Sequence, residues 1–357
     1  MVLLVFVHGY NLQNRYMQPW TMPWEPLTPT SFTEYFLANG IFRFRIPMLF
    51  IISGYLYALS DYKPYKERTT KRLRTLLLPY LIWSAVGFGI TWLFELVPYT
   101  NALIRESHIV QIDDNRMLLH DYKWYEALVR WLLVPVPYQL WFIRVLLIYN
   151  IAYPAIRWCV TNRIAKWFFF TIVIFLWINT AGFLLVEGEG LLFFSLGVWI
   201  QKTDFNIETP KRWLNPKVWA CLLVVLAAVK TWIAFRLPPL LGNFTGLALT
   251  LLHKCTIISG LIAAWFGCNG IVRWCMSRSW FVWLSAFSFI IYALHAPLVA
   301  FAIDGVFAIT NQLPFYRILD FVLLPVAVII LTIIIGFIIR SIAPKLYSLL
   351  TGGRGLQ

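Results

Sequence analysis

The sequence predicts an all-α fold, a polytopic membrane bundle of about ten transmembrane helices, on three observations. Of the 357 residues, 60% are hydrophobic and only 13% are charged, whereas soluble proteins carry about 25% charged residues. The mean hydropathy is +0.70. Apolar stretches of about 20 residues, each long enough to cross a hydrocarbon core of about 30 Å, recur along the chain. These observations exclude a protein of soluble domains. They also exclude a nucleic-acid binder, because the net charge of +14 in a membrane protein is interpreted by its position.

Eight stretches are expected to span the membrane because of their length and apolar character. They are residues 41–61, 75–97, 138–156, 167–186, 218–236, 246–267, 280–303 and 318–340. The shorter segment 188–201 is counted as a further span, because without it the basic loop that follows would lie outside. Residues 1–10 form only about 15 Å of helix. We expect them to be the second half of a truncated first span that begins upstream of Met1.

Lys and Arg concentrate on the cytoplasmic side of membrane proteins, so their distribution sets the expected orientation. The loop 62–74 holds six of them and is placed in the cytoplasm. Alternation along the chain then gives the cytoplasmic loops about twice as many Lys and Arg as the outer segments. We expect one domain over 1–357 in a bacterial cytoplasmic (inner) membrane, with both termini in the cytoplasm. Two long segments, 11–40 and 98–130, are expected outside.

Ionisable residues inside apolar spans are costly and mark candidate functional sites. The expected span interiors hold no carboxylate but eight basic or histidine residues: His8, Arg43, Arg45, Arg144, Lys230, His253, Lys254 and His295. At a rise of 1.5 Å per residue, all of them fall in the outer half of the membrane. Cations at this depth repel one another unless something anionic or wet is present. A candidate binding site for an anionic acceptor is therefore formed by Arg45, Arg144, His253 and Lys254.

Simpler interpretations of the same cations remain open. Arg43 and Lys230 can extend to the lipid headgroups along their aliphatic stems. The buried cations can also pair with outer carboxylates such as Glu187 or Glu189. The five Cys show no metal-ligand or CxxC spacing, so no metal site is expected.

Four short stretches occur in order along the expected spans. The first is the apolar run that ends in His8. The second is residues 45–56 (RIPMLFIISGYL), and the third is residues 71–80 (KRLRTLLLPY). The fourth combines residues 140–142 (LWF) with residues 292–297 (YALHAP) near the end. In this order, over nearly the whole chain, they resemble the acyltransferase-3 family of integral membrane acyltransferases. One departure is that the family's Arg, about ten residues before the first-span histidine, would lie upstream of Met1.

The resemblance implies transfer of an acyl group, commonly acetyl from acetyl-CoA, to a hydroxyl of an extracytoplasmic glycan or lipid-linked sugar. Acyl-CoA is then a co-substrate, and no permanently bound cofactor is implied. His8 matches the family's histidine and is expected to be catalytic. A neutral imidazole whose pKa lies near the operating pH can activate a weakly nucleophilic hydroxyl. An acyl-histidine intermediate is a second possibility.

Two further sets of residues follow from the resemblance. The phosphates of CoA are expected to bind Lys71, Arg72 and Arg74, because Arg can grip phosphate with two hydrogen bonds. The positive-inside rule alone explains this basic loop equally well. The acceptor or a developing oxyanion is expected to bind the outer cations. Four further residues are expected to position the site without contacting the reacting atoms: Ser53, Trp141, Tyr292 and His295.

Two functions other than acyl transfer remain. One is a transporter or flippase for an anionic glycolipid that uses the same outer cations. The lack of an acid in the expected span interiors, and of paired broken helices, weakens it. The other is a non-catalytic membrane subunit. An acyl-CoA assay that depends on His8 separates both from the enzyme.

Overall fold

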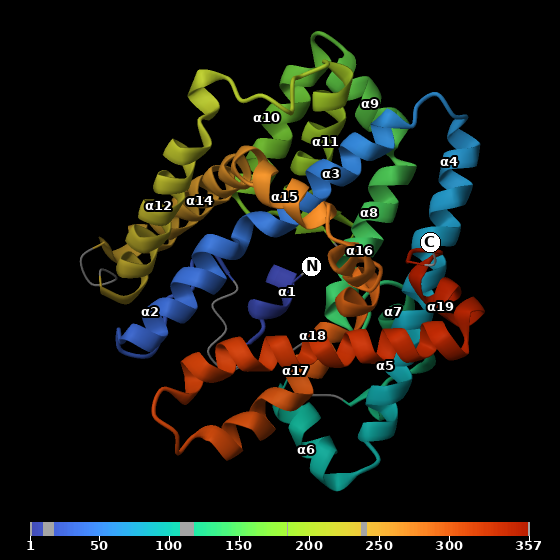
Figure 1. Ribbon diagram of the computed structural model, residues 1–357, viewed down its shortest axis with the longest axis vertical. Coiled ribbons are helices and arrows are strands. Elements are labelled where there is room, and N and C mark those ends of the chain that lie inside the picture. The colour runs from blue at the N-terminus through green and yellow to red at the C-terminus, as the bar shows by residue number, and fades with distance from the viewer. Residues whose placement is uncertain (1, 10–17, 108–117, 184, 237–240, 356–357) are drawn as a thin grey trace.

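The computed structural model describes residues 2–9, 18–107, 118–183, 185–236 and 241–355 (Figure 1). Within these residues the chain is almost entirely helical, and the strands form a single small hairpin. In this hairpin β1 (Gly182–Phe183) pairs antiparallel with β2 (Val186–Glu187). The all-α class is therefore confirmed.

The first half of the chain contains helices of very different length. In chain order they are α1 (Val2–Phe6), α2 (Pro29–Tyr35), the π-helix η2 (Phe36–Gly40), the 3-10 helix η3 (Ile41–Phe44), α3 (Arg45–Leu59), α4 (Tyr65–Arg72), the π-helix η4 (Leu73–Leu77), α5 (Leu78–Phe94), α6 (Pro98–Ser107), η5 (Leu119–Asp121), α7 (Trp124–Leu132), η6 (Tyr138–Leu140), α8 (Trp141–Ile151), α9 (Tyr153–Thr161) and α10 (Ala165–Ile178).

The second half follows the hairpin and contains the longest helices. In chain order they are α11 (Gly188–Lys202), η7 (Arg212–Leu214), α12 (Pro216–Arg236), η8 (Gly242–Phe244), α14 (Thr245–Gly267), α15 (Asn269–Met276), α16 (Ser279–Ser285), α17 (Ser288–Thr310), α18 (Tyr316–Ile342) and α19 (Pro344–Thr351). Helix α1 lies near the centre of the view in Figure 1 and contacts both α17 and α18.

A helix occupies each expected span, but the count of ten is not confirmed. Six helical runs among the described residues are long and apolar enough to cross a membrane: Pro29–Leu59, Tyr65–Phe94, Pro216–Arg236, Gly242–Gly267, Ser288–Thr310 and Tyr316–Ile342. The α8–α9 pair would make a seventh, bent by 66° where Pro154 follows Tyr153. Proline causes such bends because it lacks an N–H and crowds the preceding turn. The remaining expected spans contain α1, α10 and α11, which are shorter.

The second half of the expected outer segment 11–40 is helical, because residues 29–40 form a helical run that continues into α3. The helix begins after Thr28, whose hydroxyl accepts a hydrogen bond from the Ser31 N–H at 3.1 Å. In return, the Ser31 hydroxyl accepts from the Thr28 N–H at 2.8 Å. This reciprocal cap satisfies N–H groups that a helix start leaves unpaired. Residues 10–17 lie outside the described residues.

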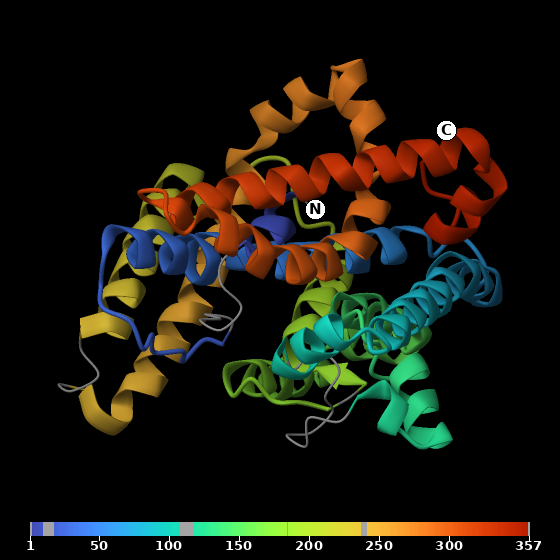
Figure 2. The same cartoon turned by 90° about the horizontal axis from the view of Figure 1, so that it is seen from below.

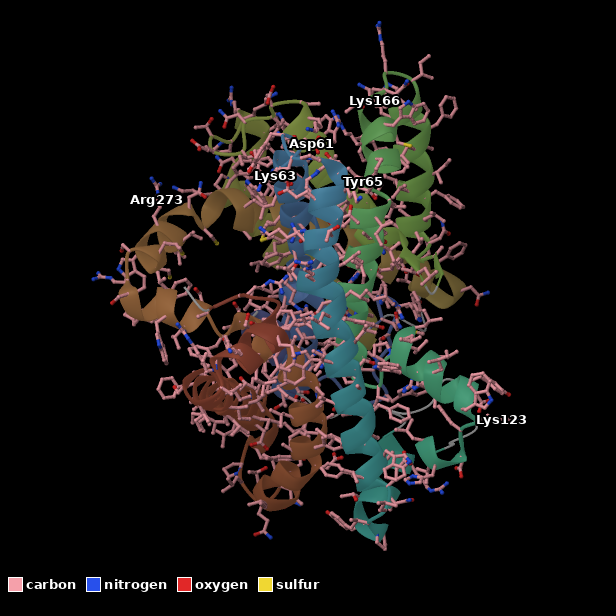
Figure 3. The ribbon with its side chains drawn as sticks, turned by 90° about the vertical axis from the view of Figure 1, so that its right-hand side faces the viewer. Asp61, Lys63, Tyr65, Lys123, Lys166 and Arg273 are labelled. Atoms are coloured by element: carbon pink, nitrogen blue, oxygen red, sulfur yellow. The ribbon has the colours of Figure 1, made fainter. Side chains whose placement is uncertain are left out.

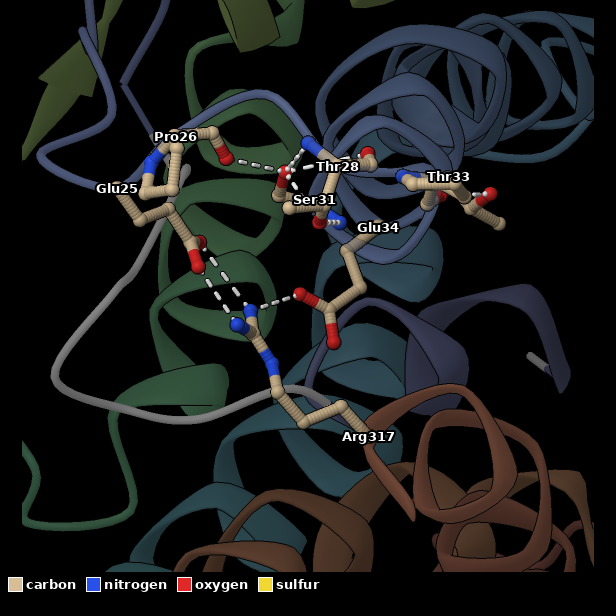
Figure 4. Close-up of polar contacts among 8 residues, drawn as sticks. Glu25, Pro26, Thr28, Ser31, Thr33, Glu34 and Arg317 are labelled. Carbon is tan, nitrogen blue, oxygen red and sulfur yellow. Dashed lines mark hydrogen bonds and ion pairs between the residues drawn. The ribbon is translucent and has the colours of Figure 1, made fainter. Parts of the chain in front are cut away.

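A carboxylate lies inside this first long helical run, in the part that precedes the expected span 41–61. Glu34 is fully buried and pairs with Arg317 at the start of α18, as Figure 4 shows. Arg317 also binds Glu25, with 2.6 Å between Nη1 and Oε2. These contacts tie the segment before α2 to the last long helix.

Helices α3 and α11 pack closely against each other. A Cβ added to Gly54 would lie 2.1 Å from the Phe194 carbonyl oxygen, and one added to Gly197 would lie 2.1 Å from that of Ile51. Neither position therefore has room for a side chain. Small residues permit such approach in membranes, where helices associate mainly through close contact. Gly54 belongs to the 45–56 stretch, so this motif residue has a packing function.

One end of the bundle is organised around Asp61, which follows α3. Its carboxylate contacts three cations: Arg68 Nη1 at 2.7 Å, Lys202 Nζ at 2.5 Å and Arg157 Nε at 3.4 Å. Tyr153 donates a hydrogen bond to it at 2.8 Å. The three cations come from three expected cytoplasmic segments, which therefore meet at one end, as Figure 3 shows with Asp61, Tyr65 and Lys166. We call it the Asp61 end.

Several expected boundaries are wrong for identifiable reasons. The basic stretch 62–74 is not a loop, because α4 begins at Tyr65 and runs on into α5. The span 167–186 ends at Ile178, because Thr180 takes a positive φ of 50° and the chain turns into the hairpin. The span 280–303 is divided into α16 and α17, of which α17 continues to Thr310.

Two further segments differ in how they meet the bundle, since α7 (Trp124–Leu132) packs against α5 while α15 and α16 do not. Helices α15 and α16 stand apart from the other helices, as the position of Arg273 in Figure 3 and the view in Figure 2 show. The expected outer segment 98–130 contains α6 and α7. There His120 Nδ1 lies 2.7 Å from Oε2 of the buried Glu95, so it is not simply solvated. His108 lies outside the described residues.

Candidate functional site

His8 lies inside the bundle, on the turn that follows α1. Its N–H donates to the Val5 carbonyl at 3.0 Å, which closes the turn. The imidazole lines a cavity of about 60 Å³, which we call the His8 cavity. Its wall also contains four residues singled out from the sequence, namely Arg45, Trp141, Tyr292 and His295. Side chains from the starts of α3 and α8 and from the middle of α17 therefore meet at His8.

Two neighbours fix the position of the His8 ring. The Tyr138 hydroxyl lies 2.9 Å from Nδ1, which is hydrogen-bonding distance. The His295 ring lies beside it, with 5.4 Å between the ring centroids. The Tyr138 hydroxyl also lies 3.4 Å from Nε2, so Tyr138 contacts both nitrogens of the His8 ring.

His295 is held in one tautomer by its own helix. Its Nδ1 lies 3.0 Å from the Ile291 carbonyl oxygen and 2.9 Å from that of Tyr292. A carbonyl only accepts hydrogen bonds, so the network assigns the proton to Nδ1. Nε2 of a neutral His295 is then an acceptor. The side chain is only 1% exposed, which suits a residue that orients its neighbour.

The sequence did not point to Tyr138 and Gln139, which both line the His8 cavity. Gln139 Nε2 donates to the Ala293 carbonyl at 2.7 Å, and the Tyr292 hydroxyl donates to the Gln139 carbonyl. These bonds join η6 to α17 beside the two histidines. The available signal was adjacency, because both residues directly precede the Leu-Trp-Phe stretch at 140–142.

A second cavity, of about 190 Å³, adjoins the first, and we call it the polar pocket. Three of the four expected acceptor-binding residues line it, namely Arg45, His253 and Lys254. Arg45 and Ile46 also line the His8 cavity, so the two cavities share a wall. Arg144 does not line the polar pocket. It projects from α8 toward Tyr80 in α5, and the expected convergence of four cations is therefore wrong for this residue.

Carboxylates reach the polar pocket as well. Glu187 and Glu189 both line it, and Glu189 accepts a hydrogen bond from the Trp177 indole at 3.2 Å. No ion pair joins Lys254 to a carboxylate within the described part of the chain. Burial, and then the neighbouring Glu189 charge, raise the pKa of Glu187 to about 8. Near neutral pH the pocket consequently holds more positive than negative charge.

Lys230 does not reach the lipid headgroups, so that alternative is wrong. Its side chain is fully buried, and Nζ donates to the Asn39 carbonyl at 2.9 Å. The same Nζ lies 3.0 Å from Nδ1 of His253. Arg43 also points inward, where its guanidinium donates to the Asn39 side chain at 2.9 Å. These contacts hold His253 at the edge of the polar pocket.

The three expected donor-binding residues are divided by the fold. Lys71 and Arg74 are exposed, whereas Arg72 is half-buried against the Tyr57 ring at 5.5 Å. Arg354, which the sequence did not single out, lies near Arg72. It donates to the Thr75 carbonyl at 3.1 Å and stacks over Phe289 at 5.0 Å. Burial, and then the Arg72 charge, lower the pKa of Arg354 to about 10.

Aromatic rings join this arginine pair to the His8 cavity. Successive ring centroids along α17 lie 6.0 Å apart for Phe289 and Tyr292, and 6.3 Å apart for Tyr292 and His295. His295 in turn contacts His8. A row of rings therefore leads from Arg354 to the candidate catalytic histidine.

Comparison with known proteins identifies the family. A family model described as an acyltransferase domain matches residues 1–341. The chain belongs to the acyltransferase-3 family. It is also 25% identical to the succinoglycan biosynthesis protein ExoH of Rhizobium meliloti (strain 1021), over 98% of this chain and 89% of that protein. No solved structure matches the chain. The protein is thus an integral membrane acyltransferase.

The stretches that suggested the acyltransferase-3 family serve different purposes in the fold. The residues from the first and fourth stretches meet in the His8 cavity. Ser53 is half-buried and lies outside that cavity, so it differs from Trp141, Tyr292 and His295, with which it was grouped. The 45–56 stretch contributes Arg45 to the cavity at one end and Gly54 to the helix crossing at the other.

Proposed function

We propose that this acyltransferase moves an acyl group, most simply acetyl from acetyl-CoA, to a hydroxyl of a glycan or lipid-linked sugar outside the membrane. The observation that carries the proposal is the His8 cavity, where two histidines, two tyrosines and an arginine meet between two basic sites. The similarity to a succinoglycan biosynthesis protein supports a polysaccharide or its lipid-linked precursor as the acceptor.

The contacts of His8 support a general-base mechanism. The His8 imidazole accepts the proton of the acceptor hydroxyl while the oxygen attacks the thioester carbonyl carbon. The C–O bond forms and the C–S bond breaks, and the proton passes from His8 to the departing CoA thiolate. Tyr138 and His295 orient the imidazole. Arg45 stabilises the oxyanion that develops on the thioester oxygen, since a fixed cation in a water-poor site is effective there.

The donor reaches His8 from the side of Arg72 and Arg354 in this proposal. CoA carries phosphates, and two half-buried arginines with little competing negative charge suit them. The pantetheine arm follows the aromatic row past Phe289 and Tyr292. The orientation that we propose places the Asp61 end and both termini in the cytoplasm of a bacterial inner membrane.

Substitution of His8 tests the function. Purified protein in vesicles would receive labelled acetyl-CoA and a lipid-linked or soluble glycan, and labelled glycan would be counted. We expect His8→Ala to lower kcat by about 10²- to 10⁴-fold, which is the range for loss of a general base.

A matched variant controls for nonspecific damage. His120→Ala removes a histidine that contacts Glu95 rather than the His8 cavity, so its kcat should stay near that of the wild type. Normal transfer by a folded His8→Ala protein would refute the mechanism. Glycolipid movement without any acyl transfer by the wild-type protein would favour the flippase.

A further inference from the structure

We propose that a groove between α10, α11 and α14 holds the hydrocarbon chain of the anionic lipid that carries the acceptor, with the lipid phosphate at Lys254. This inference rests on the proposed function and specifies its acceptor as a phosphate-linked lipid. The groove itself is independent of that function, because it follows from the packing of three helices.

The groove has a volume of about 870 Å³. Its walls are almost wholly apolar and rich in aromatic rings, with Phe170 on α10, Leu196 on α11, and Ile258 and Trp265 on α14. Figure 1 shows α10 and α11 together in its upper part, with α14 beside them. A cavity of this size and character suits a hydrocarbon chain, and it would be poorly filled by water.

The groove adjoins the polar pocket. Trp177 and Lys254 line both cavities, and Lys254 Nζ lies 5.0 Å from the centre of the Trp177 ring. An ammonium therefore stands where the apolar wall ends and the polar wall begins. This is the arrangement that an amphiphile requires, with its chain on one side of the cation and its head group on the other.

Charge in the polar pocket favours an anionic head group. Arg43, Arg45 and Lys254 face Glu187 and Glu189, and protonation of Glu187 leaves the cations in excess. A phosphate ester offers several acceptor oxygens for such donors. Because Arg45 also lines the His8 cavity, a sugar attached to this phosphate would lie next to His8.

The other end of the groove is closed by the segment between α11 and α12. The Trp265 indole donates to the Ile207 carbonyl at 3.0 Å, which pins the segment against α14. From Lys254 to Trp265 the groove follows eleven residues of helix, or about 16 Å. The donor arginines Arg72 and Arg354 do not line it, so the groove serves the acceptor rather than the acyl chain of the donor.

Two cysteines allow a test in the unmodified protein. Cys255 lines the groove and is exposed, whereas Cys221 is also exposed, on α12, but lies outside the groove. Geranylgeranyl phosphate, added to protein in detergent without any donor, should slow maleimide labelling of Cys255 at least tenfold and leave Cys221 unchanged. Equal protection by phosphatidylglycerol would overturn the proposal, because it would mark a site for bulk lipid. The absence of protection would overturn it as well.

Substitutions separate the chain from the phosphate. Ile258→Trp fills the groove and should weaken binding of geranylgeranyl phosphate more than tenfold, whereas Leu247→Trp, on an exposed part of the same helix, should leave it within twofold. Lys254→Gln should weaken the binding of geranylgeranyl phosphate but not the binding of uncharged geranylgeraniol. If folded Ile258→Trp and Lys254→Gln both bind normally, the groove is not the site.

The two proposals fail in different ways. Binding of geranylgeranyl phosphate is measured without acyl-CoA, so it does not depend on His8. Acetyl transfer to a soluble glycan together with no lipid protection of Cys255 would refute the groove alone. Lipid protection without acyl transfer to any glycan would refute the proposed function and leave a lipid site.

Discussion

Cations gather at two places in the molecule, and they are neutralised very differently. At the Asp61 end, three cations from three segments share one carboxylate, at 2.5 to 3.4 Å. In the polar pocket, Lys254 forms no ion pair with a carboxylate of the described residues, and one of the two nearby acids has its pKa raised to about 8. Saturated charge at the first place holds helices together. Unbalanced charge at the second place is available to a ligand.

The Asp61 carboxyl should give the largest effect on stability. Burial alone would raise its pKa, but hydrogen bonds from Lys202 and Tyr153 outweigh it and lower the pKa overall. Asp61→Ala leaves three cations facing one another, at a cost on the order of 3 kcal/mol. We expect the unfolding temperature in detergent to fall by roughly 4 °C. Glu189→Gln in the polar pocket should lower the unfolding temperature far less. An equal decrease in the two variants would contradict the difference between the Asp61 end and the polar pocket.

The lowered pKa of Asp61 also fixes a pH dependence of stability. The stabilisation is present above the ordinary carboxyl pKa of about 4 and is lost as the pH falls through the lower folded-state value. Acid should therefore destabilise the wild type more than Asp61→Ala. Melting curves measured from neutral to acidic pH check this. If Asp61 had no such role, the unfolding temperatures of the wild type and of Asp61→Ala would fall by the same amount.

Arg72 should affect the donor. Removing a charge-assisted phosphate contact costs about 1.5–3 kcal/mol, so the KM for acetyl-CoA should rise more than tenfold in Arg72→Ala. Lys71→Ala removes an exposed charge one residue away and is the matched control. Initial rates at varied acetyl-CoA give both constants. If the two variants behave alike, the stretch contributes only to topology.

Glu187 should make acceptor binding depend on pH. Below its pKa of about 8 the carboxyl is neutral, and above it the added negative charge opposes an anionic acceptor beside Lys254, Glu189 and His253. The KM for acceptor should therefore rise several-fold as the pH is raised through about 8. Glu187→Gln should flatten this rise. An identical profile in the variant would assign the pH dependence to another group.

Arg144 should give the smallest effect. It lies toward Tyr80 and away from the polar pocket, so Arg144→Ala should leave the KM for acceptor within about twofold of the wild type. Lys254→Gln, measured beside it, should raise that KM clearly. A large increase in the KM for acceptor in Arg144→Ala would show that Arg144 contributes to the acceptor site. It would also weaken the distinction between the neutralised cations at the Asp61 end and the unbalanced charge in the polar pocket.

Apolar length alone located a helix at every expected span, because the membrane requires long apolar helices. Their ends were harder to place, since local features decide them. The cap at Thr28 and the positive φ of Thr180 are single-residue events that hydropathy averages away. The buried ion pair between Glu34 and Arg317 joins two residues that are 283 positions apart in the sequence. A local sequence pattern cannot predict such a long-range contact.

The candidate site, like the fold, could be predicted only in part from the sequence. Short motifs were sufficient to bring His8, Trp141, Tyr292 and His295 to attention, and these four line one cavity. The depth of a residue along its helix was sufficient to predict that Arg45, His253 and Lys254 lie together, and all three line the polar pocket. It failed for Arg144, because depth carries no information about which side of a helix faces a cavity. Arg354 could not be found at all, since its approach to Arg72 depends on how the final segment folds back.

Arg45 forms part of the wall of both the His8 cavity and the polar pocket. A ligand in either cavity that shifts this guanidinium changes the other cavity too, and thermodynamic linkage makes the influence reciprocal. The binding of the donor would then change the affinity for the acceptor, and the acceptor would change the affinity for the donor by the same factor. In steady-state kinetics such an enzyme gives substrate affinities that depend on each other, so one arginine would set the cooperativity between two substrates.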